Sequence, residues 1–182
     1  MTDNALPTLQ ARTDAKLRYA RVHLDELKGH GPLGGDDFDK AHQESFLFQL
    51  LGARDAFLHE LARMYVTGLD GRHLSLGRLR DSIATQGHAC PEVSALYELE
   101  QDETSWYRQA KDFRDFSTHV QAVSRAYHLG GPDHQKVKLR HPVTGELSEA
   151  HFVDAFEDWI AKMEALISKL RQSAAISTGV AS

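Results

Sequence analysis

Cysteine is almost absent from this sequence, since Cys90 is the only one among 182 residues. A single thiol cannot form an internal disulfide, so the fold needs no oxidising compartment and we expect a cytoplasmic protein. A zinc site built on several closely spaced thiolates is excluded as well. Only His88 lies near enough in the sequence to favour a thiolate at Cys90, so we interpret this cysteine as a loop residue rather than a nucleophile.

Long apolar runs are also missing. The longest, such as the segment 46–48, extend over a few residues, far short of the about 18–20 that a membrane-spanning helix requires. The first four residues, Met-Thr-Asp-Asn, lack the basic start and the apolar run of a secretory signal. The sequence therefore predicts neither a membrane span nor a signal peptide.

Basic residues are fewer than acidic ones, 21 Lys plus Arg against 26 Asp plus Glu, which gives a formal net charge of -5. This balance argues against a protein that coats nucleic acid through bulk electrostatics, although a local basic site stays open. No His-Glu-x-x-His or Glu-x-x-His spacing occurs, so we expect neither a metal nor another cofactor, while ligands that converge from different helices remain an alternative.

Apolar residues that recur every three or four positions predict helices over most of the chain. The first should run from about Thr8 to Lys28 and end at a glycine-rich loop. A second, central helix should begin at Asp36 or Asp37. With the rest of the pattern, helices are expected over residues 8–28, 36–66, 74–86, from 91 to an interruption near 101–102, 105–127 and 148–171. The fold class that follows is all-α, an up-down bundle of four to five main helices.

Two segments depart from the helical pattern. Residues 136–140 alternate between polar and apolar, and turn residues followed by a second short run end at residue 147, so we expect a small two-stranded hairpin inserted at 136–147. The last residues, 173–182, are small and aperiodic, which predicts a flexible tail. The chain should therefore form one helical domain over 1–172.

The helix expected at 105–127 has the clearest pattern, because Trp106, Phe113, Val120 and Tyr127 recur every seven residues. Polar residues of the same segment must then lie off this apolar stripe. Asp115 and His119 are one turn apart on one face, so the carboxylate can orient the imidazole. Arg114 lies well round the helix from His119, and the two converge only if the arginine reaches across or a partner chain completes the site.

Arginine and histidine together suit chemistry at a phosphate, because a guanidinium donates paired hydrogen bonds and an imidazole transfers protons near neutral pH. An Arg five residues before a His occurs three times, as the pairs Arg18/His23, Arg54/His59 and Arg114/His119. A solvated helix face explains the first pair and is also favoured for the second. Only the third pair has a polar residue after the Arg and small residues before the His, and it lies on a helix late in the chain.

The segment Arg114-Asp115-Phe116-Ser117-Thr118-His119 resembles the Arg-polar-x-x-x-His signature of HEPN domains. These are all-α proteins of prokaryotic defence and toxin systems and are typically metal-independent ribonucleases. The helix at 44–62, with Arg54-Asp55, is similar to the second helix of a poorly characterised HEPN subgroup. The resemblance covers roughly residues 9–130. It departs from antitoxin-regulated members at Gln121, where those carry a tyrosine that is nucleotidylated, and in the hairpin insert.

The resemblance implies that the RNA's own 2′-hydroxyl attacks the phosphate while His119 moves the proton and Arg114 stabilises the developing charge. It assigns supporting roles to Asp115, which would orient His119, to Ser117 and Thr118 as phosphate donors, and to Arg54 and Asp55. It also implies an RNA substrate, no cofactor, and an antitoxin or defence-system partner protein. Because one histidine cannot serve as base and acid at once, two copies in a homodimer would complete the site.

The alternative is a non-catalytic HEPN-like module that binds a nucleotide, an RNA or a protein partner without turnover, and an unrelated helical bundle is a third interpretation. The surroundings of Arg114 discriminate between them. A basic cleft that includes Arg108, Lys111 or Arg54 would favour RNA, whereas an acidic surround would favour a structural role for this segment.

Overall fold

The computed structural model describes residues 5–30, 36–69, 74–120, 122–127 and 136–179. Within these residues it contains six helices and two short strands, so the all-α bundle expected from the sequence is confirmed. Among the described helices, none has a stretch long and apolar enough to cross a bilayer. The predicted loop at 31–35, Gln121 and the tail residues 180–182 lie outside the described residues. The helices are α1 (Ala5–Gly29), α2 (Asp37–Met64), α3 (Leu76–Thr85), α4 (Pro91–Gln101), α5 (Trp106–His119) and α6 (Phe152–Thr178).

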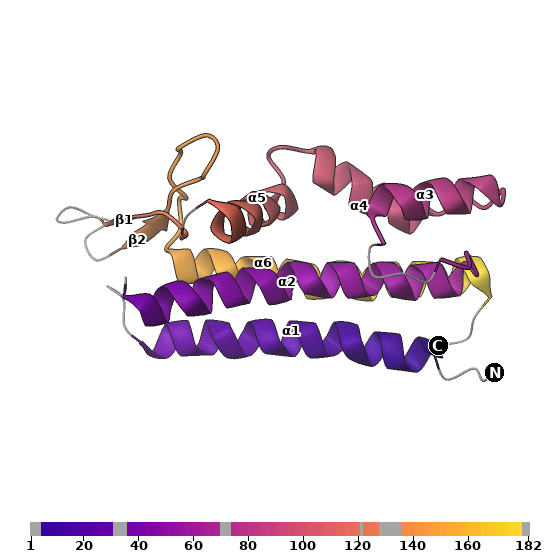
Figure 1. Cartoon of the computed structure of the whole chain (residues 1–182), viewed down its shortest axis with the longest axis horizontal. Helices are drawn as coiled ribbons and strands as arrows, with labels where there is room; N and C mark the ends of the chain where they lie inside the picture. The colour runs from indigo at the N-terminus through magenta and orange to yellow at the C-terminus, as the bar shows by residue number, and fades with distance from the viewer. Residues whose placement is uncertain (1–4, 31–35, 70–73, 121, 128–135, 180–182) are drawn as a thin grey trace.

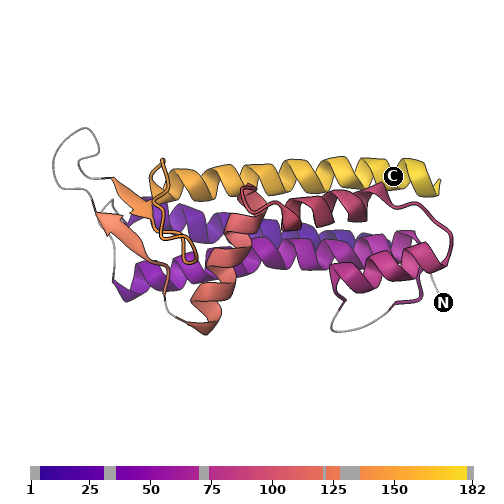
Figure 2. The ribbon, with the colours of Figure 1, turned by 90° about the horizontal axis from the view of Figure 1, so that it is seen from above.

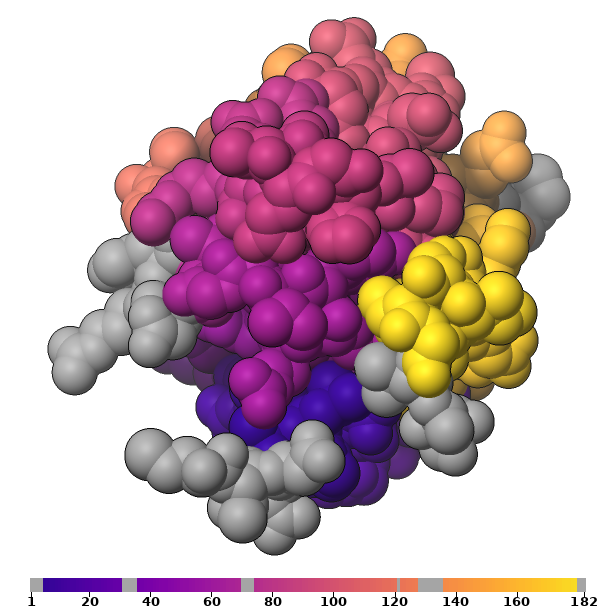
Figure 3. Space-filling view, turned by 90° about the vertical axis from the view of Figure 1, so that its right-hand side faces the viewer, coloured from indigo at the N-terminus to yellow at the C-terminus, as the bar shows by residue number. Residues whose placement is uncertain are grey.

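Three long helices form the base of the molecule (Figure 1). α1 and α2 make an antiparallel pair, and α6 lies beside both and runs in the same direction as α2. The shorter helices α3, α4 and α5 cover the face of α2 that α1 leaves free. The space-filling view shows α3 and α4 over α2, with α1 beneath and the end of α6 at the side (Figure 3). α2 is therefore covered on several sides, in agreement with the central helix expected from the sequence.

The core follows from the apolar stripes of the helices. α1 buries Leu17, Ala20, Leu24 and Leu27, the face that the sequence pattern predicted. On α2, the Phe46 ring stacks on Phe156 of α6, with 4.5 Å between ring centroids. The N-terminus of α2 is capped by Asp36, whose side chain accepts a hydrogen bond from the backbone N–H of Asp39. The boundaries of α1 to α4 agree with the sequence prediction to within a few residues.

α5 is shorter than predicted, because it ends at His119 rather than near residue 127. Val120 is 66% exposed, and Tyr127 lies in strand β1 (Arg125–Tyr127) with 46% of its surface exposed. The seven-residue repeat therefore does not extend beyond Phe113 as a buried face. The physical reason is tertiary, since this segment instead pairs with a second strand and its Arg125 forms an ion pair with buried Asp39, with 3.4 Å between Nη1 and Oδ2.

The small sheet exists, but with a different partner from the one predicted. β1 pairs antiparallel with β2 (Val137–Leu139), so that Arg125 lies opposite Leu139. The turn that follows contributes only an isolated bridge between Arg140 and Leu147. The two strands are therefore 125–127 and 137–139, and not the two halves of 136–147.

The predicted flexible tail is wrong as far as Thr178, because α6 continues to that residue. Ala174 is fully buried, and the Ser173 hydroxyl donates a hydrogen bond to the carboxylate of Glu92 on α4. Tyr65 donates to the other oxygen of the same carboxylate at 2.7 Å. The last residues have a composition typical of a disordered end. They are nevertheless helical, because the fully buried Glu92 carboxylate needs hydrogen-bond donors and Ser173 supplies one.

A second buried acid joins the long helices. Glu60 on α2 is fully buried, and both its oxygens accept hydrogen bonds from Arg171 on α6, each at 2.9 Å. The remaining Nη1 of Arg171 lies 2.8 Å from the Asp14 carboxylate on α1. One guanidinium therefore connects α1, α2 and α6. A comparable but exposed pair joins Arg21 on α1 to Glu164 on α6.

We expect Arg171→Met to lower the free energy of unfolding by about 3 kcal/mol, because it leaves the Glu60 carboxylate buried without its counter-charge. Arg21→Met is the control, since it removes an exposed pair between α1 and α6, two of the three helices that Arg171 connects, and should cost less than about 1 kcal/mol. Urea denaturation at neutral pH measures both. Equal losses for the two variants would contradict a special role of the buried pair.

Candidate functional site

α5 carries the residues singled out from the sequence. Ser105 caps its N-terminus by accepting a hydrogen bond from the Arg108 backbone N–H. Its buried residues are Tyr107, Ala110 and Phe113, so Phe113 of the predicted stripe is buried, while Trp106, at which the stripe began, is only partly buried. Viewed from above, α5 crosses α2 at a steep angle (Figure 2).

Arg114 and His119 both lie outside the buried face, as predicted. The side chain of Arg114 is 23% exposed, and His119 is an exposed residue that ends the helix. Within the described part of the chain, the side chain of His119 makes no hydrogen bond or ion pair. Its imidazole is therefore available to a ligand or to a second chain, while nothing described in this chain fixes its tautomer.

Asp115 is engaged with residues other than His119. Its Oδ1 lies 2.7 Å from Arg114 Nε, and its Oδ2 accepts a hydrogen bond from Lys111 Nζ at 2.9 Å. Partial burial acts to raise the pKa of Asp115, but the hydrogen bond from Lys111 and the charge of Arg114 outweigh it and hold the pKa below its ordinary value. The carboxylate is thus charged at neutral pH and positions Arg114, rather than orienting His119 as expected.

Ser117 and Thr118 use their hydroxyl protons inside the helix. Both donate to the backbone carbonyl of Arg114, at 3.0 and 2.8 Å. Bonds of this kind are common for hydroxyl residues in helices. The two side chains therefore offer acceptor oxygens, and not the phosphate donors that the resemblance implied.

Arg54 is a buried structural residue of α2, only 8% exposed. Its Nη1 lies 3.0 Å from Asp55 Oδ1, its Nη2 lies 3.8 Å from Glu100 Oε2 of α4, and its guanidinium carbon lies 5.7 Å from the centre of the Tyr107 ring. Burial acts to lower the pKa of Arg54, but Tyr107, Asp55 and Glu100 together raise it above its ordinary value. Arg54 thus ties α2 to α4 and α5 and does not face solvent. Sequence reasoning missed Glu100 and Tyr107 as partners of Arg54, because only the folded chain brings α4 and α5 beside it.

The surroundings of Arg114 are balanced in charge. Each cation near it has an acidic neighbour, since Arg54 and Lys111 both approach Glu100, and Arg108 Nε lies 3.0 Å from Asp112. The basic cleft that would favour RNA is therefore not formed by the described residues of one chain. The acidic surround that would favour a structural role is not formed either.

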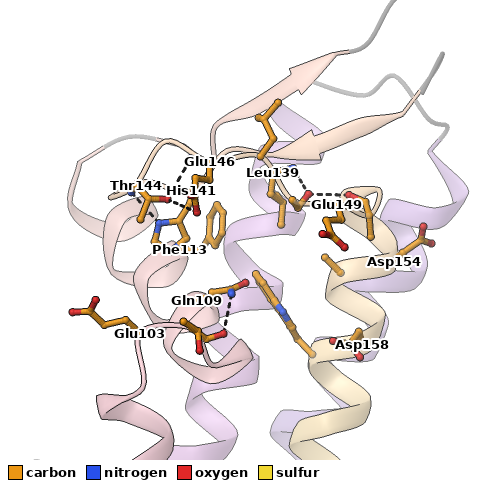
Figure 4. A pocket seen from close by; sticks show the side chains of 16 residues that line it. Glu103, Gln109, Phe113, Leu139, His141, Thr144, Glu146, Glu149, Asp154 and Asp158 are labelled. Carbon is orange, nitrogen blue, oxygen red and sulfur yellow. Dashed lines mark hydrogen bonds between the residues drawn. The ribbon is translucent and has the colours of Figure 1, made fainter. Parts of the chain in front are cut away.

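A pocket of about 720 Å³ opens on the side of α5 that faces α6 and the small sheet (Figure 4). Phe113 and Trp159 form part of its wall, and His141 lies at its rim with Nδ1 accepting from the backbone N–H groups of Val143 and Thr144. None of the described residues that line it is a lysine or arginine, while five are carboxylates: Glu103, Glu146, Glu149, Asp154 and Asp158. Such a lining repels phosphate, so the pocket does not extend an RNA site.

Cys90 has the environment of an unreactive thiol. Burial is the main influence that raises the pKa of Cys90, to about 11. Its Sγ donates to the Glu92 carboxylate, with 3.3 Å between the two atoms. The thiol therefore stays protonated at neutral pH, in agreement with its interpretation as a loop residue rather than a nucleophile.

Comparison with known proteins places the chain in a family but assigns it no activity. Residues 6–177 match the model of DUF6586, described as a family of unknown function. No curated protein and no solved structure matches the chain.

We expect Arg54→Ala to lower the free energy of unfolding by about 2 kcal/mol, because it removes a buried guanidinium and its packing against Tyr107. Arg114→Ala and His119→Ala should change it by less than about 0.5 kcal/mol, since both residues lie outside the core. Thermal and chemical denaturation of the three variants make the comparison. A large loss for His119→Ala would mean that this residue is structural.

Proposed function

Since the chain belongs to the DUF6586 family, whose description assigns no activity, we propose a function from α5 itself: an HEPN-like, metal-independent endoribonuclease. The observation that carries the proposal is the state of the Arg114/His119 pair. The His119 side chain is exposed with no partner among the described residues. Arg114 forms an ion pair with Asp115 through Nε, and its two Nη groups donate no hydrogen bond to a described residue. An available imidazole and a positioned guanidinium five residues apart are the groups that the HEPN signature requires.

The chemistry requires no redox or metal partner. His119 takes the proton of the RNA 2′-hydroxyl, whose oxygen attacks the adjacent phosphorus. The Nη groups of Arg114 bind the non-bridging oxygens as negative charge accumulates in the five-coordinate state. The bond to the 5′-oxygen then breaks, and that oxygen takes a proton from a second, protonated imidazole. The products are a 2′,3′-cyclic phosphate and a 5′-hydroxyl.

The second imidazole is the reason for proposing a homodimer. Because His119 lies at an exposed helix end, a two-fold axis near this end would bring two copies of it to one groove. Val120, the residue after His119, is 66% exposed and supplies apolar surface beside it. From the resemblance alone, we place this activity in a toxin or phage-defence setting with an antitoxin or defence partner.

The balanced charges favour a second candidate, the non-catalytic module. Lys111 and Arg114 share the Asp115 carboxylate, which lowers the net positive charge offered to an RNA backbone. In that case the same Arg114 and His119 would hold a nucleotide, an RNA or a protein partner without turnover.

We expect RNA cleavage to proceed in excess EDTA and to leave 2′,3′-cyclic phosphate ends, because the proposed reaction uses only protein groups. His119→Ala and Arg114→Ala should each lower the rate at least about 100-fold. His59→Ala is the matched control, since it changes the histidine of the Arg54/His59 pair at the same spacing and should retain activity. Gel and mass analysis of a labelled RNA measures rate and ends. Binding without cleavage, with both α5 variants weakened, would instead support the non-catalytic module.

Light scattering coupled to size exclusion should give twice the chain mass of 20.4 kDa at tens of micromolar. Val120→Asp should shift the population toward monomer, because it places charge within the proposed contact. Val143→Asp is the control at an equally apolar and more exposed position, 75% exposed, on the turn after β2. A wild-type chain that is monomeric at this concentration would contradict the dimer.

A further inference from the structure

Three potential metal ligands meet where α1 ends and α2 begins. His30 follows the last residue of α1, Asp36 caps α2, and Asp39 lies in the first turn of that helix. One ligand atom from each lies within 4.8 Å of the other two. His30 Nε2 and Asp36 Oδ2 are 3.0 Å apart. This end of the bundle is the one that carries β1 and β2 (Figure 1).

Asp39 is the member of this group that needs an explanation. It is 1% exposed, and its Oδ1 has no hydrogen-bond partner, although the oxygen is fully shielded from water. Its Oδ2 is accounted for by the ion pair with Arg125 Nη1 at 3.4 Å. One turn further along α2, Gln43 is also 1% exposed with both amide atoms unpartnered. A buried carboxylate oxygen without a partner is costly, and a bound cation is one of the few species that would satisfy it.

The donor set selects the class of ion. A neutral imidazole with two carboxylates suits zinc and similar transition ions, whereas Mg²⁺ and Ca²⁺ prefer oxygen alone. A nitrogen and an oxygen 3.0 Å apart can both bind one Zn²⁺ at the usual distances of about 2.0–2.2 Å. Three protein ligands leave a fourth position for water. Arg125 would then orient the Asp39 carboxylate through their ion pair, as residues that contact metal ligands commonly do.

We propose that His30, Asp36 and Asp39 form a binding site for a divalent transition metal ion of the zinc class. The ion would clamp the start of α2 to the end of α1, and through Asp39 and Arg125 it would also tie in β1. Ligand motifs read from sequence spacing miss this set, because the residues come from two helix ends. This metal ion would serve the structure and is independent of RNA cleavage, whose reacting groups lie on α5.

The test uses the full chain, stripped of metal by a chelator and then dialysed. Calorimetric titration with Zn²⁺ should give one site per chain, and Co²⁺ should produce a visible absorption band. Mg²⁺ and Ca²⁺ should not compete. His30→Gln should weaken Zn²⁺ binding at least about 10-fold without loss of folding, because His30 is exposed. Asp39→Asn should weaken it as well.

The controls are chosen within the same turn and residue type. Asp37→Asn removes a neighbouring acid that is exposed and, among the described residues, pairs with Lys40 alone, so binding should be unchanged. His88→Gln removes an exposed histidine outside the site. Absence of Zn²⁺ binding, equal binding by wild type and His30→Gln, or displacement by Mg²⁺ or Ca²⁺ would each overturn the proposal. Since binding is read directly, none of these results depends on whether the chain cleaves RNA.

Discussion

The buried carboxylate of Glu60 is the constraint on which the arrangement of the long helices depends. A fully buried acid is tolerated only with its counter-charge in place, and Arg171 supplies it from a helix 111 residues later in the chain. Because both oxygens are bonded, α6 can sit against α2 at only one register. The same guanidinium contacts Asp14, so α1 is fixed with them. With these three helices aligned, α5 has a defined surface to pack on, and Phe113 meets Trp159 of α6 with 5.8 Å between ring centroids.

The helices whose bounds depend on residues near in sequence could be predicted from the sequence. α1 to α4 follow apolar periodicity, capping residues and Pro91, and each begins and ends close to its expected position. The end of α5 was different, because the spacing of Val120 and Tyr127 matched a helix by coincidence while Arg125 is drawn to Asp39 across the fold. The last residues of α6 look disordered by composition, yet Glu92 holds them through Ser173. Both differences arise from contacts between residues distant in sequence.

The candidate site was predictable to a similar degree. The position of Arg114 and His119 outside the buried face follows from helix geometry and could be predicted from the sequence. The partner of Asp115 could not, since Lys111 and His119 are each one turn away and only the structure selects Lys111. The role of Arg54 was equally hidden, because its burial depends on α4 bringing Glu100 alongside. The cluster of His30, Asp36 and Asp39 required knowing how closely two helix ends approach each other.

The acidic pocket beside α5 affects how an anion can reach the molecule. Asp158 pairs with Lys162, but the other four carboxylates form no ion pair within the described residues, so their field extends from that side of the helix into solvent. A polyanion would be steered away from this side and toward the opposite flank of α5. Dissolved salt would screen the repulsion over about 10 Å at 0.1 M and so ease the encounter. The association rate of such a ligand would then increase with ionic strength, opposite to the behaviour of proteins that bind through a basic groove.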